Sequence, residues 1–484
     1  MLFNSYIFIF LFLPITCVGY FLINKWNYTC GKIWLLGMSL WFYAYFNIKY
    51  LPIIVISICF NYAINWLIMR TSVLVLKRVW LCIGLAANIG VLFYYKYYDF
   101  FTENINALFQ ADFTLHHLIL PLGISFFTFQ QLSYVIDSYK GEVPNYNFLD
   151  YSLFVTYFPQ LIAGPIVSHD EIVPQFADIS KKRLNYENLS KGIMAFSFGL
   201  AKKVLLADTF GNAVNWGFTN TEALDTTNAL LVMLFYTFQI YFDFSGYCDM
   251  ASGIGLMFNI DLPMNFNSPY RALTITDFWK RWHITLTRFF TRYIYIPLGG
   301  NRKGKVRTYI NIFIVFLVSG LWHGANWTFI LWGVLHGVFS LLTRMFDKPV
   351  KKMHPALSWL ITFGFINITW IYFRADSIGQ ANLIVKNILK CNFGSINSSI
   401  LNAFSLPEFS LLSSIFRHGI FADSRLYFLL FTAFAFFAVL FMKNTNERIR
   451  TYKPTISISC ISVVLLVWCI ISFSGVSTFL YFNF

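Results

Sequence analysis

One histidine lies where two apolar runs of this sequence meet, and its surroundings suit acid–base chemistry. His323 occurs in the segment SGLWHGANW, residues 319–327, with glycines at short range on both sides. An ionisable group in apolar surroundings is costly and by default marks a function or a buried pair. A neutral imidazole, whose reference pKa is about 6.5, can remove a proton from a hydroxyl. Trp322 and Asn326 are candidates for supporting roles, and Asn326, one helical turn later, could orient the ring. The alternative is a structural histidine between two helices.

A second histidine, His283, follows a run of charged and aromatic residues, DFWKRWH at 277–283. On one straight helix, four charged residues would fall within about 40° of one line: Asp277, Arg281, Arg288 and Arg292. His283 would point roughly 200° away from Arg281, toward the aromatic face. Such a helix would lie at the membrane interface, turn His283 into the protein and leave the arginines for headgroups or a donor's phosphates. Simple interfacial anchoring explains the arginines equally well, but not the imidazole.

A basic loop and a buried carboxylate complete the set of candidates. The loop at 302–307, RKGKVR, could hold the phosphates of a nucleotide-bearing donor, or could simply be a topology signal. Asp243 shares a helical face with Gln239 and Tyr247. Because a buried carboxylate needs a partner, we expect an arginine or His283 beside it, in a structural or orienting role more than a chemical one.

The remaining histidines carry no such constellation. His336 lies 13 residues after His323. On one continuous helix it would be about 140° around and some 20 Å along the axis, so we expect it to be structural and outside the His323 site. His116, His117, His169, His354 and His418 fall in or near expected loops. No metal-ligand spacing is present, and the eight cysteines include no CxxC pair.

These candidates must be positioned by membrane helices. Of the 484 residues, 57% are hydrophobic and 12% charged, against roughly 25% charged in ordinary soluble domains. This composition excludes a soluble fold. The net charge of +14 fits the positive-inside rule, and we do not expect nucleic acid as a partner. Backbone groups in lipid must bond internally, which forces the apolar runs to be helices.

The apolar runs predict an all-α, polytopic membrane protein with about 11–13 transmembrane or re-entrant helices. The runs are 2–23, 33–47, 51–69, 78–95, 115–136, 150–165, 192–207, 227–247, 308–323, 325–345, 356–373, 425–442 and 456–480. Basic residues around the first and third loops, including Lys25 and Arg70, favour an external N-terminus and a retained first helix. We expect one membrane domain with three parts: N-terminal helices at 1–114, a catalytic core at 115–374, and an external loop with C-terminal helices at 375–484.

Several of these segments together resemble the membrane-bound O-acyltransferase (MBOAT) family. The resemblance rests on FPQLIAGPI at 158–166 and on residues 241–250, 278–300 and 320–327. The C-terminal FLYFNF at 479–484 also resembles the tail of the bacterial branch that O-acetylates alginate and peptidoglycan and D-alanylates teichoic acid. The family fold implied is a ring of tilted helices around a central catalytic tunnel, with His323 as the principal catalytic histidine and His283 as the second.

The resemblance also implies a reaction and its partners. An acyl thioester, acetyl-CoA above all, would dock at the cytosolic face near the arginines, with no bound cofactor and no metal. His323 would assist transfer of the acetyl group, which would reach an extracytoplasmic polysaccharide through a periplasmic SGNH-hydrolase-like partner. The protein would then lie in the bacterial inner membrane as a multi-pass enzyme.

Two alternatives stay open on the sequence alone. A transporter of polysaccharide precursors would also be polytopic and basic, with ionisable residues in the membrane. A non-catalytic subunit of a polymer-export complex would need neither histidine. No residue distinguishes alginate from peptidoglycan as the acceptor.

Overall fold

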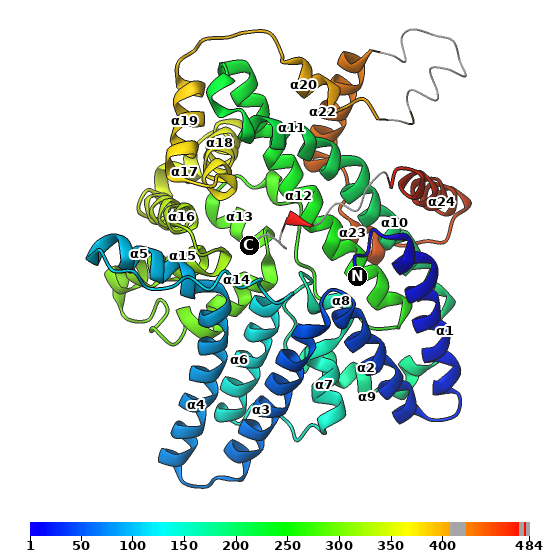
Figure 1. The fold of residues 1–484 in the computed structure, drawn as a ribbon. Coiled ribbons are helices and arrows are strands. Elements are labelled where there is room, and N and C mark those ends of the chain that lie inside the picture. Colours follow the sequence, from blue (N-terminus) through cyan, green and yellow to red (C-terminus); the bar gives the residue numbers. More distant parts are fainter. Residues whose placement is uncertain (407, 409–422, 474–478, 481–484) are drawn as a thin grey trace. The chain divides into compact units, whose positions relative to one another are not determined.

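Helices make up all the regular secondary structure in the described part of the chain. The structure is a computed structural model of residues 1–484, and it describes all of them except 407, 409–422, 474–478 and 481–484 (Figure 1). Among the described residues no β-strand occurs. The all-α class predicted from the apolar runs is confirmed. Residues 481–484, part of the tail that carries the family resemblance, lie outside the described residues.

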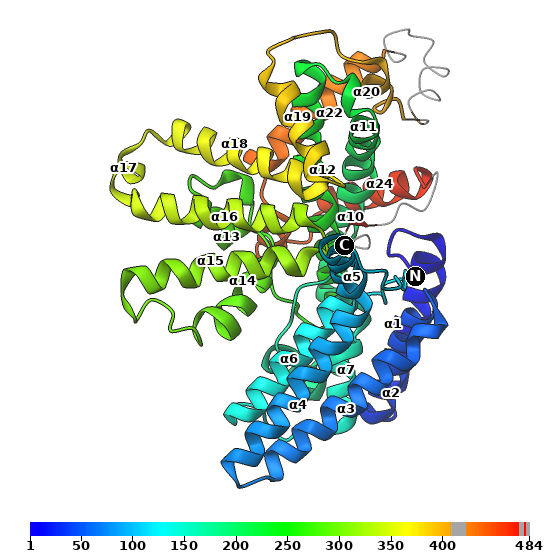
Figure 2. The same ribbon diagram turned by 60° about the vertical axis from the view of Figure 1, so that its left-hand side comes forward.

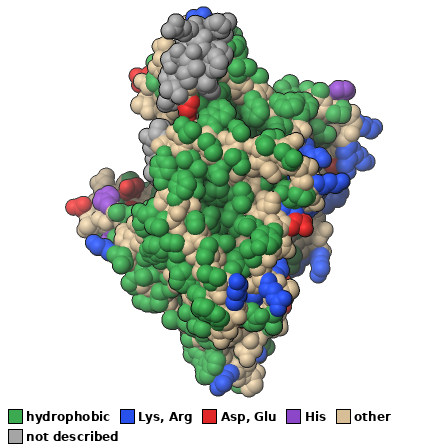
Figure 3. Space-filling view, turned by 90° about the vertical axis from the view of Figure 1, so that its right-hand side faces the viewer, with side chains coloured by type: hydrophobic (Ala, Val, Ile, Leu, Met, Phe, Trp, Pro, Cys, Tyr) green, Lys and Arg blue, Asp and Glu red, His purple; other side chains and the backbone are tan. Residues whose placement is uncertain are grey.

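Six described helical segments are long and apolar enough to cross a membrane. They are Ile48–Arg70, Leu74–Phe109, α12 (Thr226–Met257), α15 (Gly304–His323), α16 (Trp327–Met345) and α18 (Pro355–Arg374). Shorter apolar helices are Phe8–Asn24, α22 (Ser424–Leu440) and α24 (Ile456–Ile471). Hydrophobic side chains also cover much of the surface in Figure 3. The chain is a multi-pass membrane protein.

Other predicted apolar runs form helices that are short or broken. The run at 115–136 gives α6 (Ile124–Lys140), and the run at 150–165 gives α7 (Phe148–Thr156) and α8 (Phe158–Leu161). Tyr157 separates α7 from α8 because its backbone leaves the helical region, at φ −50° and ψ 108°. Hydropathy alone overlooks such breaks, which explains why fewer helices reach full membrane length than the run count suggests.

The chain folds into two compact units. The first comprises residues 1–196 and 250–263, and the second comprises 197–249 and 264–484. In the first unit α3 (Leu51–Arg70), α4 (Leu74–Leu92) and α6 lie side by side (Figures 1 and 2). Buried amides join them, since Asn88 Nδ2 donates to Asn61 Oδ1 at 2.6 Å and Asn61 Nδ2 donates to Gln131 Oε1. The division into 1–114, 115–374 and 375–484 stays a prediction.

In the second unit α15 and α16 form a closely packed hairpin (Figure 2). Two glycines permit the close approach. A Cβ at Gly333 would lie 2.5 Å from the carbonyl oxygen of Phe316, and a Cβ at Gly320 would meet the carbonyl oxygen of Phe329. Both obstacles are backbone atoms, so no side-chain rotation relieves the clash. Residue types at these two positions therefore fix the spacing of the helices that bear His323.

Replacing Gly320 with alanine should force α15 and α16 apart. Overpacking of this kind costs about 1–3 kcal/mol. We expect Gly320→Ala to lower the unfolding temperature of the purified protein in detergent. Gly364→Ala is the matched control, because a Cβ there meets nothing within 4 Å and Gly364 also lies in a membrane helix, α18. Equal unfolding temperatures for the two variants would contradict the packing argument.

Candidate functional site

His323 is the last residue of α15, at the turn of the hairpin. Gly324 is extended, with φ −167° and ψ 154°, and ends the helix. Asn326 then begins α16, where its side chain accepts a hydrogen bond from Thr328 N at 3.0 Å. Asparagine is among the favoured residues at this position. The HGAN sequence thus ends one membrane helix, starts the next, and holds His323 between them.

Aromatic rings surround the His323 imidazole, which is 3% exposed. Its ring centroid lies 4.9 Å from Trp322, 5.1 Å from Trp332 of α16 and 5.0 Å from Phe373 of α18. Three helices therefore contribute rings to one aromatic cluster around His323. A side chain packed by rigid rings is held in one orientation, as a reacting group requires.

His283 lies at a break between two short helices. It follows α13 (Ile275–Arg281) and precedes α14 (Ile284–Phe290), with φ 44° and ψ 54°. This left-handed conformation is uncommon for residues other than glycine. The side chain is fully buried, and its Nδ1 lies 3.1 Å from Asn265 Oδ1. Burial lowers the pKa of His283 to about 3, so its imidazole is neutral at physiological pH.

Asn265 determines this local backbone. Its main-chain oxygen accepts a hydrogen bond from Ile284 N at 3.0 Å. Its side-chain Oδ1 accepts from Thr285 N at 3.2 Å and from Thr285 Oγ1 at 2.9 Å. Its Nδ2 donates to Cys248 Sγ of α12 at 3.4 Å. One buried asparagine thus ties the start of α14 to α12 and orients His283. No sequence motif marks Asn265, because its role depends on contacts with residues distant along the chain.

The single basic helix predicted for 277–292 is wrong. The chain leaves the helical conformation at Trp282 and His283, so the arginines lie on α13, α14 and the π-helix η8 (Thr291–Tyr295) and form no continuous stripe. Periodicity could not reveal this break, because bonds to Asn265 cause it. Within α13 the spacing does hold, and Arg281 Nε donates to Asp277 Oδ1 at 2.9 Å. Arg288 is exposed, whereas Arg292 is half-buried with its guanidinium carbon 5.5 Å from the Tyr293 ring centre.

Trp322 lies against both histidines. Its ring centroid is 6.1 Å from that of His283 and 4.9 Å from that of His323. The two imidazoles are 40 positions apart in the sequence, and the second unit brings them to one indole. Two buried imidazoles therefore share one apolar neighbour.

Asp243 has a different partner from those expected. Lys203 of the π-helix η5 (Lys202–Ala207) places its Nζ 2.7 Å from Asp243 Oδ1 and 2.8 Å from Asp208 Oδ1. Asp243 Oδ2 accepts a hydrogen bond from Leu480 N at 3.0 Å. The expectation of an arginine or His283 as partner is therefore wrong. The sequence does contain a signal for this pair, because Lys203 lies in the apolar run at 192–207 and a lysine inside such a run needs a buried partner.

Two further expectations need correction. Asn326 does not orient His323, because its Oδ1 caps α16 and its Nδ2 donates to Asp376 O at 3.0 Å. His336 does approach the His323 site, because both imidazoles contact Trp332. The ring centroid of Trp332 lies 4.7 Å from that of His336 and 5.1 Å from that of His323. The predicted separation assumed one continuous helix, but the chain reverses at 324–326. His336 Nε2 lies 3.0 Å from Thr369 Oγ1, in agreement with a structural role.

The first unit contains a buried histidine, His169, which we expected in or near a loop with no constellation around it; that expectation is wrong. His169 Nδ1 lies 3.3 Å from the Tyr146 hydroxyl, and its Nε2 lies 3.4 Å from Asp137 Oδ2. His169 begins α9 (His169–Ala177). The three residues share no motif spacing, so only folding reveals the group. Among the described residues, no three His, Cys, Asp or Glu side chains gather as a metal site.

Asn265→Leu should disturb the His283 site without touching His323. The substitution removes the acceptor for Thr285 N, and an unsatisfied buried donor costs about 1–3 kcal/mol. We expect a lower unfolding temperature and at least a tenfold loss of activity per folded molecule, because a small misplacement of a reacting group has an effect of this size. Asn188→Leu offers a control, because the Asn188 side chain also makes a hydrogen bond, to Asn259 Oδ1, but in the first unit. Full activity of Asn265→Leu would contradict a positioning role.

Comparison with known proteins decides the family. The model of the membrane-bound O-acyltransferase family matches residues 122–378, more than half of the chain. The chain belongs to this family. The matched part contains Asp243, His283 and His323. The MBOAT protein is thus a membrane acyltransferase that uses an acyl donor, which favours the enzyme over the transporter and the non-catalytic subunit.

Named relatives agree with the family. The peptidoglycan O-acetyltransferase of Helicobacter pylori is 43% identical over 527 aligned positions, which cover 100% of this chain and 98% of the relative. The probable alginate O-acetylase AlgI of Pseudomonas aeruginosa is 37% identical over 84% of this chain and 78% of its own. The teichoic acid D-alanyltransferase of Bacillus subtilis is 29% identical over 59% of this chain and 75% of its own. The bacterial branch expected from the sequence motifs is confirmed.

Proposed function

We propose that this MBOAT protein transfers an acetyl group from a cytosolic thioester, acetyl-CoA, across the inner membrane for O-acetylation of an extracytoplasmic glycan. Peptidoglycan is the preferred acceptor. The peptidoglycan O-acetyltransferase matches this chain at higher identity, and over more of its own length, than the alginate O-acetylase does. The observation that carries the proposal is the pair of buried imidazoles against Trp322 in an acyltransferase family.

His323 acts as the general base in this proposal. It accepts the proton of an acceptor hydroxyl while the oxygen attacks the thioester carbonyl. The carbon–sulfur bond then breaks, and the imidazolium returns its proton to the leaving thiolate. His283 is neutral, and its hydrogen bond to Asn265 fixes the ring, so it orients the donor or stabilises developing charge. Trp322 forms the apolar wall between them.

The donor's phosphates would meet cations at the cytosolic side. Arg302 and Lys303 lie in the turn before α15, Lys305 and Arg307 lie in its first turn, and all four are exposed, as is Arg288 on α14. Phosphate oxygens bind best to such cations. On the opposite side of the membrane, the hydroxyl acetylated in this step would belong to an SGNH-hydrolase-like partner, which would then transfer the acetyl group to a glycan hydroxyl and regain its own.

Deleting the gene tests this function directly. Peptidoglycan and other surface glycans are purified from wild-type, deletion and complemented strains, and acetate released by mild base is measured by chromatography. We expect peptidoglycan-bound acetate to disappear on deletion and return on complementation. Acetate unchanged in peptidoglycan but lost from another glycan would reassign the acceptor. Acetate unchanged in every glycan would contradict the activity.

A further inference from the structure

A cavity of about 350 Å³ lies in the second unit, and neither His283 nor His323 lines it. It is bounded by α22, α24, α12, η5, the end of α10 (Tyr186–Ala201) and α23 (Thr445–Arg450). Its volume falls within the range of ligand sites, roughly 300–1,000 Å³. The proposed acyl transfer gives this cavity no role.

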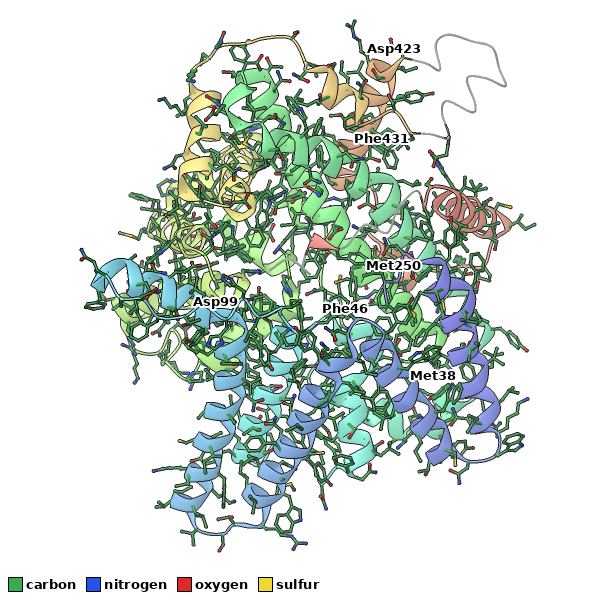
Figure 4. The ribbon with its side chains drawn as sticks, in the orientation of Figure 1. Met38, Phe46, Asp99, Met250, Asp423 and Phe431 are labelled. Carbon is green, nitrogen blue, oxygen red and sulfur yellow. The ribbon has the colours of Figure 1, made fainter. Side chains whose placement is uncertain are left out.

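The walls of the cavity are apolar and reach the outer surface of α22. Leu430, Phe431, Phe434 and Ala438 line it from this helix, and Trp468 lines it from α24. Figure 4 labels Phe431 on α22, two turns beyond Asp423 at the start of that helix. Leu430 and Phe434 are 54% and 47% exposed. Because α22 is an apolar helix of a multi-pass membrane protein, we infer that these exposed side chains face hydrocarbon, where a lipid chain can enter beside them.

Cations gather at one end of the cavity. Lys443 and Arg448 line it there, and the connection from 441 to 455 contains four basic residues and a single carboxylate. The Arg448 guanidinium lies 5.2 Å from the Phe198 ring centre, and its Nε donates to Lys443 O at 3.3 Å. Under the positive-inside rule, this connection faces the cytosol. The cationic end therefore lies at the headgroup level of the inner leaflet, where anionic lipids are attracted to basic residues.

A third cation that lines the cavity, Lys202, already forms an ion pair with a carboxylate. Its Nζ lies 2.6 Å from Asp249 Oδ2, and Asp249 Oδ2 also accepts from Thr445 Oγ1 at 2.5 Å. The Lys202–Asp249 pair joins η5 to α12, and the Thr445 hydroxyl joins α23 to the same carboxylate. Lys443 and Arg448 are thus the cations that a ligand's anionic group would meet.

We propose that the cavity binds one anionic phospholipid of the cytosolic leaflet. Its acyl chain lies along α22 and α24, and its phosphate contacts Lys443 and Arg448. The two cations at the mouth of the cavity complement the negative phosphate, and the apolar walls behind them match the acyl chain. Acetyl-CoA is also anionic, but its acyl group has two carbons and its pantetheine arm would bury amides against apolar walls, which is costly without hydrogen bonds.

The test measures lipid binding by the purified full-length protein. Delipidated protein in detergent is titrated with phosphatidylglycerol, phosphatidylcholine or acetyl-CoA, with thermal unfolding and native mass spectrometry as readouts. We expect phosphatidylglycerol to bind and raise the unfolding temperature more than phosphatidylcholine does. Lys443→Gln/Arg448→Gln should weaken phosphatidylglycerol binding about tenfold. Arg450→Gln/Lys453→Gln is the matched control, because it removes two cations from the same connection but outside the cavity lining.

A second variant tests the apolar part. Ala438→Trp fills the cavity and should abolish the stabilisation by both lipids. If the double glutamine variant fails to fold, Lys443→Gln alone is measured, since Lys443 is exposed. Equal stabilisation by both lipids, equal losses in the cavity and control variants, or displacement of lipid by acetyl-CoA would each overturn the proposal. No readout depends on glycan acetylation, so these results are separate from those for the proposed function.

Discussion

His323→Ala is expected to reduce O-acetylation by a factor of about 100 to 10,000, the usual contribution of a general base. The alanine variant keeps the helix end and Gly324 intact, so the hairpin should still form. Activity is measured as base-labile acetate on peptidoglycan in the deletion strain, normalised to the amount of folded protein in the membrane.

The control for this experiment is another histidine of the second unit. His354 is exposed, and its Nδ1 accepts a hydrogen bond from Ala356 N at the start of α18. His354→Asn retains a side chain that can cap the helix. We expect this variant to acetylate like the wild type. If His323→Ala retained full acetylation at normal protein level, the assignment of His323 as the base would be wrong.

Lys203→Met should be the most destabilising of the substitutions considered for this protein. Lys203 and Asp243 are each 2% exposed, and removal of the ammonium leaves Asp243 buried with only the Leu480 N–H as its neighbour among the contacts described above. Breaking a buried pair by removing one partner costs about 3–5 kcal/mol. We expect little folded protein in the membrane and a sharply lower unfolding temperature in detergent.

Two comparisons separate this effect from general damage. Lys191→Met removes a lysine paired with the exposed carboxylate of Glu187, four positions away on α10. Such surface pairs contribute about 0–1 kcal/mol, so this variant should remain near the wild type. Adding Asp243→Asn to Lys203→Met removes the uncompensated charge and should restore part of the lost stability. Equal stability of Lys203→Met and Lys191→Met would contradict the buried-pair argument.

Local sequence was sufficient for the class of protein, and it singled out the two candidate histidines. Composition and apolar runs identified a helical membrane protein, because a lipid environment leaves few ways to satisfy backbone polar groups. His323 was found because an imidazole between apolar runs is unusual, and the i,i+4 pair of Asp277 and Arg281 followed from helical spacing. The MBOAT motifs then indicated the family that comparison confirmed.

Tertiary structure decided what periodicity could not. Asn265 interrupts the helix at His283, Lys203 instead of an arginine pairs with Asp243, and the turn at 324–326 brings His336 back beside Trp332. Helical periodicity describes one continuous helix and its neighbours within a few residues. Each of these contacts joins residues that are distant along the chain or lie on either side of a helix break. Packing and buried hydrogen bonds fix them, and neither leaves a periodic signal in the sequence.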